Sequence, residues 1–268
     1  MATPTDTKTA LIVGATGQTG GHLLKELLAS PHFNRVYEYG RRLTNVESLT
    51  EGKEKLEQKK IDFDKLEEDG SLKGGNWDVV FITLGTSRAN AGSAEAFEKI
   101  DRDSVAPGEE MPLPSQNSLN RPDTYFERQR KLNPAIRRVL NALFIAPGGA
   151  NMNSHFLYPR SKGLTEHGLA LLGYSDTIIF RPGLLVGTER PQHRMVESAF
   201  GVVTGFLSYF SSSFEIKVAT LGKAMANTGF LGTGKLPPQA QATEFGKEGA
   251  KFTLIGNSGA LELAKLEL

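Results

Sequence analysis

Short apolar runs alternate along the chain with stretches in which apolar residues recur at helical spacing. This alternation predicts an α/β fold, a doubly wound and mostly parallel sheet with helices on both faces. The predicted strands are Ala10–Val13, Arg35–Tyr39, Lys60–Phe63, Trp77–Leu84, Leu140–Ile145 and Thr177–Phe180. The predicted helices are Thr19–Ala29, Ser93–Val105, Tyr158–Leu172, Met195–Phe210 and Ala260–Leu266, the last one capped by Asn257 or Ser258.

The segment from Ala106 to Arg138 interrupts the alternation. Its prolines forbid the continuous helix that should connect the fourth and fifth strands of a parallel sheet. The connection is also long, because a whole βαβ unit takes roughly 30 residues. We expect one NAD(P)-binding domain over residues 1–268, with residues 106–138 an irregular or disordered insert. A functional lid and a sequence foreign to the protein are the alternatives.

The composition narrows the function classes. A net charge of +1, from 31 basic and 30 acidic residues, gives no reason to expect nucleic-acid binding. The absence of cysteine excludes disulfides and thiolate chemistry, and the five histidines do not cluster with acids, so no metal site is predicted. Residues 1–9 show no targeting pattern, and the apolar patch Phe200–Phe210 is shorter than the ~20 residues of a spanning helix. We expect a protein that is soluble or attached only to a membrane surface.

Three glycines stand between the first predicted strand and the first predicted helix, in the sequence Gly-Ala-Thr-Gly-Gln-Thr-Gly. Such a turn presents unsatisfied N–H groups and the positive end of the helix dipole to an anion, and glycine lets a pyrophosphate approach the backbone. A turn rich in Gly and Thr for steric reasons alone is the alternative. We predict that a dinucleotide is bound by Gly14, Thr16, Gly17, Gln18, Thr19 and Gly20.

Two arginines follow the second predicted strand. A site for NAD would place an acid there to bind the ribose hydroxyls, but Glu38 lies inside the strand and Arg41 and Arg42 come after it. Because guanidinium groups bind a 2′-phosphate bidentately, the pair predicts NADP. A solvated basic turn is the alternative. Three further residues are predicted to lie along the cofactor, at the ends of the third and fourth strands: Asp62, Leu84 and Gly85.

Tyr158 and Lys162 are four residues apart in a predicted helix and therefore share one face of it. In that arrangement the ammonium lowers the pKa of the phenol and holds the nicotinamide ribose, while the tyrosine protonates a carbonyl as hydride arrives. A tyrosine and a lysine at this spacing are common, and their place after the fifth strand is what favours the catalytic interpretation. Pro159 between them requires that the helix begin close by.

Together these motifs resemble the atypical short-chain dehydrogenases of the Tat-interacting-protein type, above all their fungal relatives associated with the mitochondrial outer membrane. The resemblance covers roughly residues 9–105 and 149–230. It implies a single NADPH-binding domain with Arg181 near the nicotinamide end of the cofactor, although an Arg-Pro-Gly turn can also simply end a strand. It further implies the cytosolic face of the mitochondrial outer membrane, with a peripheral membrane contact or a protein partner; otherwise we expect a cytoplasmic protein. The motifs are Gly14–Gly20, Tyr39–Arg42, Leu84–Arg88, Asp101–Asp103, Phe156–Gly163 and Phe180–Gly183.

The chain departs from this family where a pair of serines should hold the substrate carbonyl. The corresponding positions are Ala146 and Pro147, which donate no hydrogen bond; Ser154 is too close to Tyr158, and Thr86 or Ser87 could approach instead. Losing one such donor typically costs ~10²–10³ in rate.

Three functions therefore stay open. The first is an NADP-dependent oxidoreductase that reduces a small carbonyl compound, and the second is a catalytically weak regulatory or scaffold protein that binds the cofactor. The third is a nucleotide-sugar epimerase, which we expect to need a fuller substrate domain than the segment after Arg181. An apolar stripe predicts a core or pocket helix, or else a membrane-facing or partner-facing one; its residues are Val196, Phe200, Val203, Phe206, Leu207 and Phe210.

Overall fold

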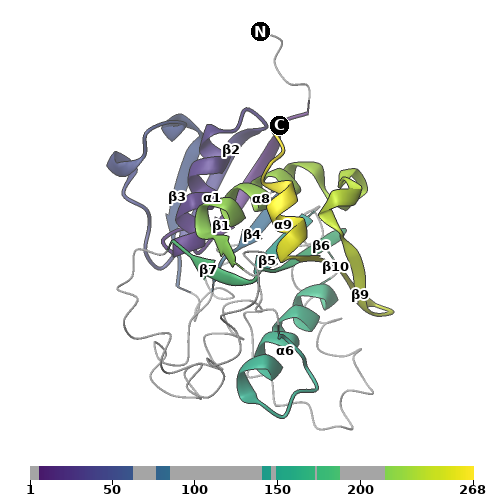
Figure 1. Ribbon diagram of the computed structural model, residues 1–268. Helices are drawn as coiled ribbons and strands as arrows, with labels where there is room; N and C mark the ends of the chain where they lie inside the picture. Colours follow the sequence, from purple (N-terminus) through teal and green to yellow (C-terminus); the bar gives the residue numbers. More distant parts are fainter. Residues whose placement is uncertain (1–5, 63–76, 85–140, 146–148, 173, 188–214) are drawn as a thin grey trace.

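The protein has a mostly parallel central sheet with helices on both faces, as the alternating pattern predicted (Figure 1). A computed structural model describes residues 6–62, 77–84, 141–145, 149–172, 174–187 and 215–268. The strand order is β3-β2-β1-β4-β5-β6-β10-β9, and among these described strands only the β9–β10 pair is antiparallel. The strands are β1 (Lys8–Val13), β2 (Phe33–Gly40), β3 (Leu56–Lys60), β4 (Val79–Ile82), β5 (Asn141–Ile145), β6 (Asp176–Arg181), β9 (Thr243–Lys247) and β10 (Ala250–Gly256).

Three helices cover one face of the sheet and one described helix covers the other. Helices α1 (Gln18–Ala29), α8 (Val218–Leu231) and α9 (Asn257–Leu263) pack together on the first face (Figure 1). Helix α6 (Leu157–Leu171) lies on the second face. A small parallel sheet pairs β7 (Leu184–Val186) with β8 (Glu215–Lys217), and four short 3₁₀ turns span Val46–Ser48, Lys53–Lys55, Thr233–Lys235 and Pro238–Ala240.

The pattern of buried residues explains why these segments form helices and strands. All four residues of β4 are buried, because a central strand of a doubly wound sheet has no solvent face. The leucines of α1 recur at i, i+1, i+4 and i+5 and are almost fully buried against the sheet. They are Leu23, Leu24, Leu27 and Leu28. At about 25 cal/mol per Å² of buried apolar surface, each such side chain contributes on the order of 2 kcal/mol.

The structure corrects several element boundaries. The third strand is Leu56–Lys60 rather than Lys60–Phe63, and it is an edge strand whose side chains are largely exposed. The last helix is capped by Gly256 and not by Asn257 or Ser258; the Asn257 side chain instead accepts a hydrogen bond from the Gly183 N–H at 2.8 Å. Helix α8 and strands β7 to β10 were not predicted. The helices predicted at 93–105 and 195–210, and the segment 106–138, lie outside the described residues.

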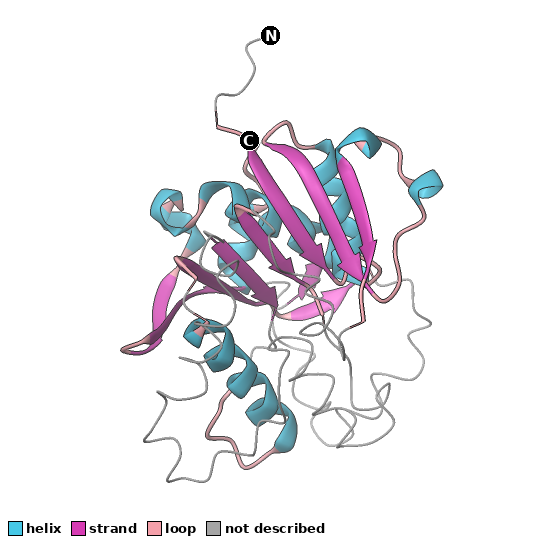
Figure 2. Ribbon diagram, turned by 180° about the vertical axis from the view of Figure 1, so that it is seen from behind, coloured by secondary structure: helices cyan, strands magenta, loops and turns pink. Residues whose placement is uncertain are grey.

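The parallel strands all end at the same lower edge of the sheet, where their arrowheads meet in Figure 2. In a doubly wound fold ligands bind at this carboxyl edge, where the strand order reverses. Here the order reverses between β1 and β4. In the described part of the chain, no helix is long and apolar enough to cross a bilayer.

Candidate functional site

The glycine-rich turn between β1 and α1 is closely packed. Gly14 has φ +97°, which an L side chain rarely adopts, and its carbonyl accepts a hydrogen bond from the Gly17 N–H at 2.9 Å. A Cβ on Gly20 would lie 2.2 Å from the Gly14 carbonyl oxygen. Because Gly20 has no Cβ, the first turn of α1 can pack directly against the end of β1.

The first turn of α1 has no side chain that caps it or offsets its dipole. Gly17 caps the helix without a side-chain hydrogen bond, and the first turn carries no acidic residue that would compensate the dipole. Thr16 and Gly17 are exposed, Gln18 is half-buried, and Thr19 and Gly20 are buried beneath them. The predicted cradle therefore divides into an exposed part that a ligand can reach and a buried part that shapes it.

The ends of β1 and β4 are joined next to this turn. The backbone N–H and the hydroxyl of Thr83 both donate to the Val13 carbonyl, at 2.9 and 3.1 Å. A Cβ on Gly14 would lie only 2.9 Å from Thr83 Oγ1, so Thr83 packs directly against the glycine-rich turn. Leu84 is half-buried beside it, as expected for a residue at the edge of the site, whereas Gly85 lies outside the described residues.

At the end of β2 an acidic side chain is buried and two basic side chains are exposed. Glu38 is almost fully buried, and its carboxylate accepts three hydrogen bonds, from the N–H and the hydroxyl of Thr44 and from the amide of Gln58, at 2.7 to 2.8 Å. Arg41 and Arg42 follow on an exposed turn and make no hydrogen bond or ion pair with another described residue. The acid therefore supports the turn, and the two guanidinium groups face solvent.

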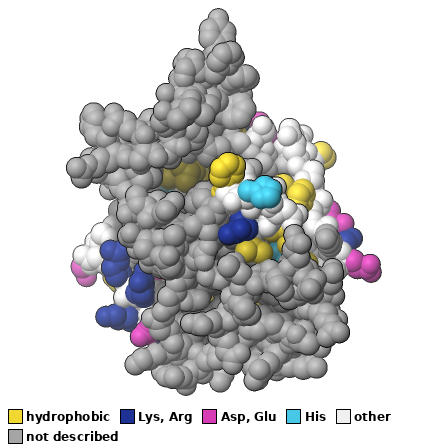
Figure 3. Space-filling view, turned by 90° about the horizontal axis from the view of Figure 1, so that it is seen from below, with side chains coloured by type: hydrophobic (Ala, Val, Ile, Leu, Met, Phe, Trp, Pro, Cys, Tyr) yellow, Lys and Arg dark blue, Asp and Glu magenta, His cyan; other side chains and the backbone are white. Residues whose placement is uncertain are grey.

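Lys and Arg side chains gather on the lower face of the molecule, on the side of β2 and β3 (Figure 3). Lys60 ends β3 and pairs with Gly40 across the sheet, directly before Arg41. Asp62 follows two residues later and is exposed. This corner of the carboxyl edge is thus predominantly basic.

Helix α6 contains both Tyr158 and Lys162. The helix begins at Leu157, so Pro159 lies in its first turn, where a missing N–H leaves no hydrogen bond unmade. Pro159 therefore does not separate Tyr158 from Lys162, which lie one turn apart. Lys162 is 4% exposed, an unusual burial for a lysine.

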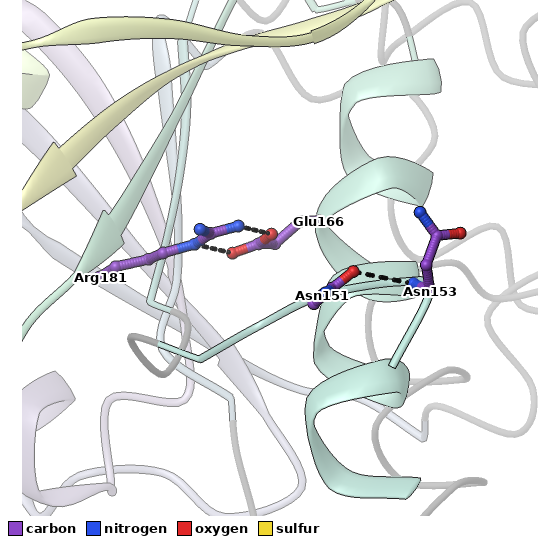
Figure 4. A network of polar contacts seen from close by, with 4 residues as sticks. All are labelled: Asn151, Asn153, Glu166 and Arg181. Atoms are coloured by element: carbon purple, nitrogen blue, oxygen red, sulfur yellow. Dashed lines mark hydrogen bonds and ion pairs between the residues drawn. The ribbon is translucent and has the colours of Figure 1, made fainter. Parts of the chain in front are cut away.

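The chain that follows β5 passes close to this helix. A Cβ on Gly163 would stand 2.2 Å from the Met152 nitrogen, and the Asn151 N–H donates to the Pro159 carbonyl at 2.9 Å. The Asn151 side chain in turn accepts from the Asn153 N–H at 2.9 Å (Figure 4). Residues 150–153 are thereby held against the turn of α6 that carries Lys162. Ala146 and Pro147, at the positions of the expected serines, lie outside the described residues.

Arg181, predicted to lie at the cofactor, forms a bidentate ion pair with Glu166 of α6 (Figure 4). Burial raises the pKa of the Glu166 carboxyl above its ordinary value, and the hydrogen bond from Arg181 only partly offsets this rise. Sequence reasoning missed Glu166. Its signal was available, because Tyr158, Lys162 and Glu166 recur every four residues and so lie on one stripe of the helix. A contact of Arg181 with the cofactor stays a prediction.

Known proteins resemble this chain in sequence and in fold. No protein-family model matches it. HTATIP2 of Rattus norvegicus is 31% identical over 223 residues, which are 82% of this chain and 80% of that protein. The mitochondrial protein fmp52 of Emericella nidulans is 29% identical over 231 residues, or 84% and 89% of the two chains.

Two solved structures share the fold at low sequence identity. The nucleoside-diphosphate-sugar epimerase of Agrobacterium tumefaciens has a TM-score of 0.59 at 12% identity, covering 89% of this chain and 73% of that one. The KRED1-Pglu enzyme has a TM-score of 0.55 at 16% identity, covering 85% and 96%. As its motifs predicted, the chain belongs to the family of HTATIP2 and the fungal mitochondrial FMP52 proteins.

Proposed function

We propose that this protein binds NADPH at the carboxyl edge of β1, β2 and β4 and uses it to reduce a small carbonyl compound. The observation that supports NADPH as the cofactor is that the acidic side chain at the end of β2 is buried while the two basic side chains are exposed. Glu38, the acid that could have bound the ribose hydroxyls of NADH, is buried with its carboxylate occupied by Thr44 and Gln58. Arg41 and Arg42 are exposed and suit a 2′-phosphate.

The turn between β1 and α1 fits the pyrophosphate of such a cofactor. Its exposed residues are Thr16 and Gly17, and the uncapped helix behind them lacks a competing carboxylate. A solved structure with the same fold, that of the Bordetella bronchiseptica enzyme WbmF, was determined in complex with NAD+, with a TM-score of 0.51 at 14% identity. This likeness supports a dinucleotide, and the two arginines support NADP over NAD.

The reduction needs a hydride and a proton. A nicotinamide cofactor held by the glycine-rich turn and by Arg41 and Arg42 would supply the hydride to the carbonyl carbon, and Tyr158 would donate the proton to the carbonyl oxygen, which gives an alcohol. Lys162, one turn later on α6, holds the ribose and favours the ionised phenol that remains after proton transfer. The buried position of Lys162 strengthens its field, because little water screens it.

A second candidate is a catalytically weak protein whose cofactor-bound form docks a partner. It is favoured by Ala146 and Pro147, which supply no donor for the substrate oxygen. The relatives named mitochondrial favour a mitochondrial location for either candidate, and we propose the cytosolic face of the outer membrane with peripheral attachment.

Titration with NADPH and NADH, with nicotinamide fluorescence as the readout, tests which of the two nucleotides the protein binds more tightly. We expect tight NADPH binding that Arg41→Ala/Arg42→Ala weakens by about 10²-fold, toward the affinity for NADH. A matched control, Lys235→Ala/Lys251→Ala, also removes two cations but breaks only exposed ion pairs with Asp6 and Glu244. Equal affinity of the wild-type protein for both nucleotides would contradict the assignment of the two arginines.

Steady-state reduction of a panel of aldehydes and ketones separates the two candidates. The reductase predicts NADPH oxidation that Tyr158→Phe lowers by about 10²–10⁴-fold while NADPH affinity stays within about twofold. The docking protein predicts NADPH binding without turnover of any carbonyl in the panel. Restoring the serine pair, with Ala146→Ser/Pro147→Ser, should raise turnover in the first case and leave it absent in the second.

A further inference from the structure

The Glu166–Arg181 pair joins helix α6 to the end of β6. Arg181 Nε donates to one carboxylate oxygen at 2.8 Å and Nη2 donates to the other at 2.5 Å, so each oxygen accepts one hydrogen bond from the guanidinium. The Glu166 side chain is 3% exposed and that of Arg181 is 15% exposed. Buried pairs of this kind contribute little net stability, because desolvation offsets the attraction, but losing one partner leaves a costly buried charge. The pair therefore invites an explanation other than stability.

Glu166 stands at the point where α6 leaves the sheet. The end of the helix packs against the second face through Leu169, Ala170 and Leu172. The beginning of the helix, with Tyr158 and Lys162, extends past the carboxyl edge (Figures 1 and 2). The pair thus holds α6 at the turn that directly follows Lys162 in the sequence.

Arg181 is also held from a second direction. Its guanidinium carbon lies 5.2 Å from the centroid of the Phe245 ring, in a cation–π contact. Phe245 belongs to β9 and packs against Phe252 of β10, with ring centroids 5.5 Å apart. The guanidinium plane is therefore constrained by the β9–β10 hairpin as well as by Glu166, and it cannot easily turn away from the carboxylate.

Lys162 and Glu166 are four positions apart on one helix and are both buried. Side chains at this spacing lie within reach of each other. A buried carboxylate without a partner is costly, so it either takes up a proton or pairs with a cation within reach. On this helix the cation at i−4 is Lys162, the residue assigned to the ribose and to Tyr158.

We propose that Glu166 and Arg181 form a positioning pair for Lys162, in which the guanidinium of Arg181 neutralises the Glu166 carboxylate and so weakens its attraction for the Lys162 ammonium. The proposal rests on the proposed function for the role of Lys162, but the contacts that carry it are those of the pair itself. Glu166 is a positioning residue, because it acts through Arg181 and Lys162 and is not assigned a contact with substrate.

The test compares Arg181→Met with the double variant Glu166→Leu/Arg181→Met. The single variant leaves the carboxylate unpaired, whereas the double variant removes the carboxylate as well. Competitive acetylation with acetic anhydride, read by peptide mass spectrometry without any cofactor, reports the reactivity of Lys162 relative to exposed Lys60. We expect Lys162 labelling to fall about tenfold in Arg181→Met, the order that one charge-assisted hydrogen bond gives. It should return to within about twofold of the wild type in the double variant.

A purely structural clamp predicts the opposite order, with the double variant no better than the single one, and that result would overturn the proposal. Equal labelling in all three proteins would do the same. If Arg181→Met does not fold by circular dichroism, Arg181→Lys replaces it; the ammonium keeps the charge but lacks the bidentate geometry, so intermediate labelling is expected.

The two proposals fail in different ways. A wild-type protein that binds no NADPH would refute the proposed function, yet the labelling pattern at Lys162 would still decide whether the pair controls that ammonium. A protein that binds NADPH and shows no change of labelling would keep the proposed function and refute the positioning role.

Discussion

Gly20 and Gly14 lie so close together that a Cβ on Gly20 would stand 2.2 Å from the Gly14 carbonyl oxygen and 2.6 Å from Thr83 Oγ1. Both neighbours are fixed: Gly14 by its position at the end of β1, and Thr83 by its two hydrogen bonds to the Val13 carbonyl. The third glycine of the motif is thus required by the contact between helix and strand. Gly17 differs, because a Cβ there would meet the Gly14 oxygen only at 3.1 Å and would otherwise face solvent.

This difference predicts two separate effects of adding a methyl group. Gly20→Ala should lower the free energy of unfolding by about 1–3 kcal/mol, the usual cost of overpacking, and should weaken NADPH binding as a consequence. Gly17→Ala should change stability by less than about 1 kcal/mol, because its φ is −79°, yet should weaken NADPH binding at least as much by crowding the pyrophosphate. Urea unfolding and nucleotide titration measure the two quantities. Equal losses of stability in both variants would contradict this division of roles.

The hydrogen bonds of buried Glu38 predict that removing its carboxylate lowers both the stability of the protein and its preference for NADPH over NADH. Glu38→Ala leaves the Thr44 N–H and the Gln58 amide without their acceptor, so we expect a loss of about 1–3 kcal/mol in the free energy of unfolding. Because Thr44 anchors the turn that carries Arg41 and Arg42, affinity for NADPH should fall more than affinity for NADH. The control is Glu57→Ala on neighbouring β3, an exposed partner of Arg35, which should stay within about 0.5 kcal/mol of the wild type.

How much the sequence predicts depends on where each segment lies in the fold. Val79–Ile82 is buried on both faces, and its continuous apolar run was read correctly as a central strand. Strand β3, Leu-Glu-Gln-Lys-Lys, is an edge strand with mostly exposed side chains, so no apolar pattern marks it. β9, at the opposite edge and equally exposed, was missed for the same reason.

Tertiary contacts explain the remaining misses. Helix α8 was not predicted, because its glycines weaken the local helical signal. Those glycines serve packing: a Cβ on Gly222 would lie 2.9 Å from the Leu23 nitrogen of α1, and one on Gly229 would lie 2.4 Å from the Phe81 ring of β4. The pairing of Arg181 with Glu166 likewise depends on how α6 packs beside β6, which no local pattern encodes. The motifs of the candidate site were found because a strand, a turn and a helix contiguous in sequence build them.

The close contact of Gly163 with residues 150–153 predicts that a larger side chain at position 163 displaces these residues relative to α6. Gly163→Ala would place a Cβ 2.2 Å from the Met152 nitrogen and 2.5 Å from the Asn151 carbonyl carbon, so residues 150–153 must shift. We expect a loss of about 1–3 kcal/mol in the free energy of unfolding and a lower turnover number, with NADPH affinity less affected. Gly234→Ala is the matched control, because nothing lies within 4 Å of its Cβ. A variant at Gly163 with unchanged stability and turnover would show that this contact positions nothing.

The raised pKa of Glu166 predicts how stability depends on pH. The folded protein holds a proton on Glu166 at a pH where the unfolded chain, with the ordinary value of 4.5, has already lost it. Proton binding that is stronger in the folded state makes stability fall as pH rises. Glu166 therefore lowers the free energy of unfolding progressively as pH rises from about 4.5 through its raised pKa. Below that window its contribution no longer changes.

Glu166→Gln isolates this contribution, because the amide does not titrate while most other groups are unchanged. We expect the free energy of unfolding of the wild type minus that of Glu166→Gln to decrease as pH rises from 4.5 and then to level off. Urea unfolding at half-unit steps from pH 4 to pH 8 measures the difference, and Glu244→Gln controls for removing one exposed carboxylate. A difference that instead grows with pH would mean that the hydrogen bonds from Arg181 outweigh burial. The carboxylate would then be held by Arg181 so firmly that its desolvation is fully compensated.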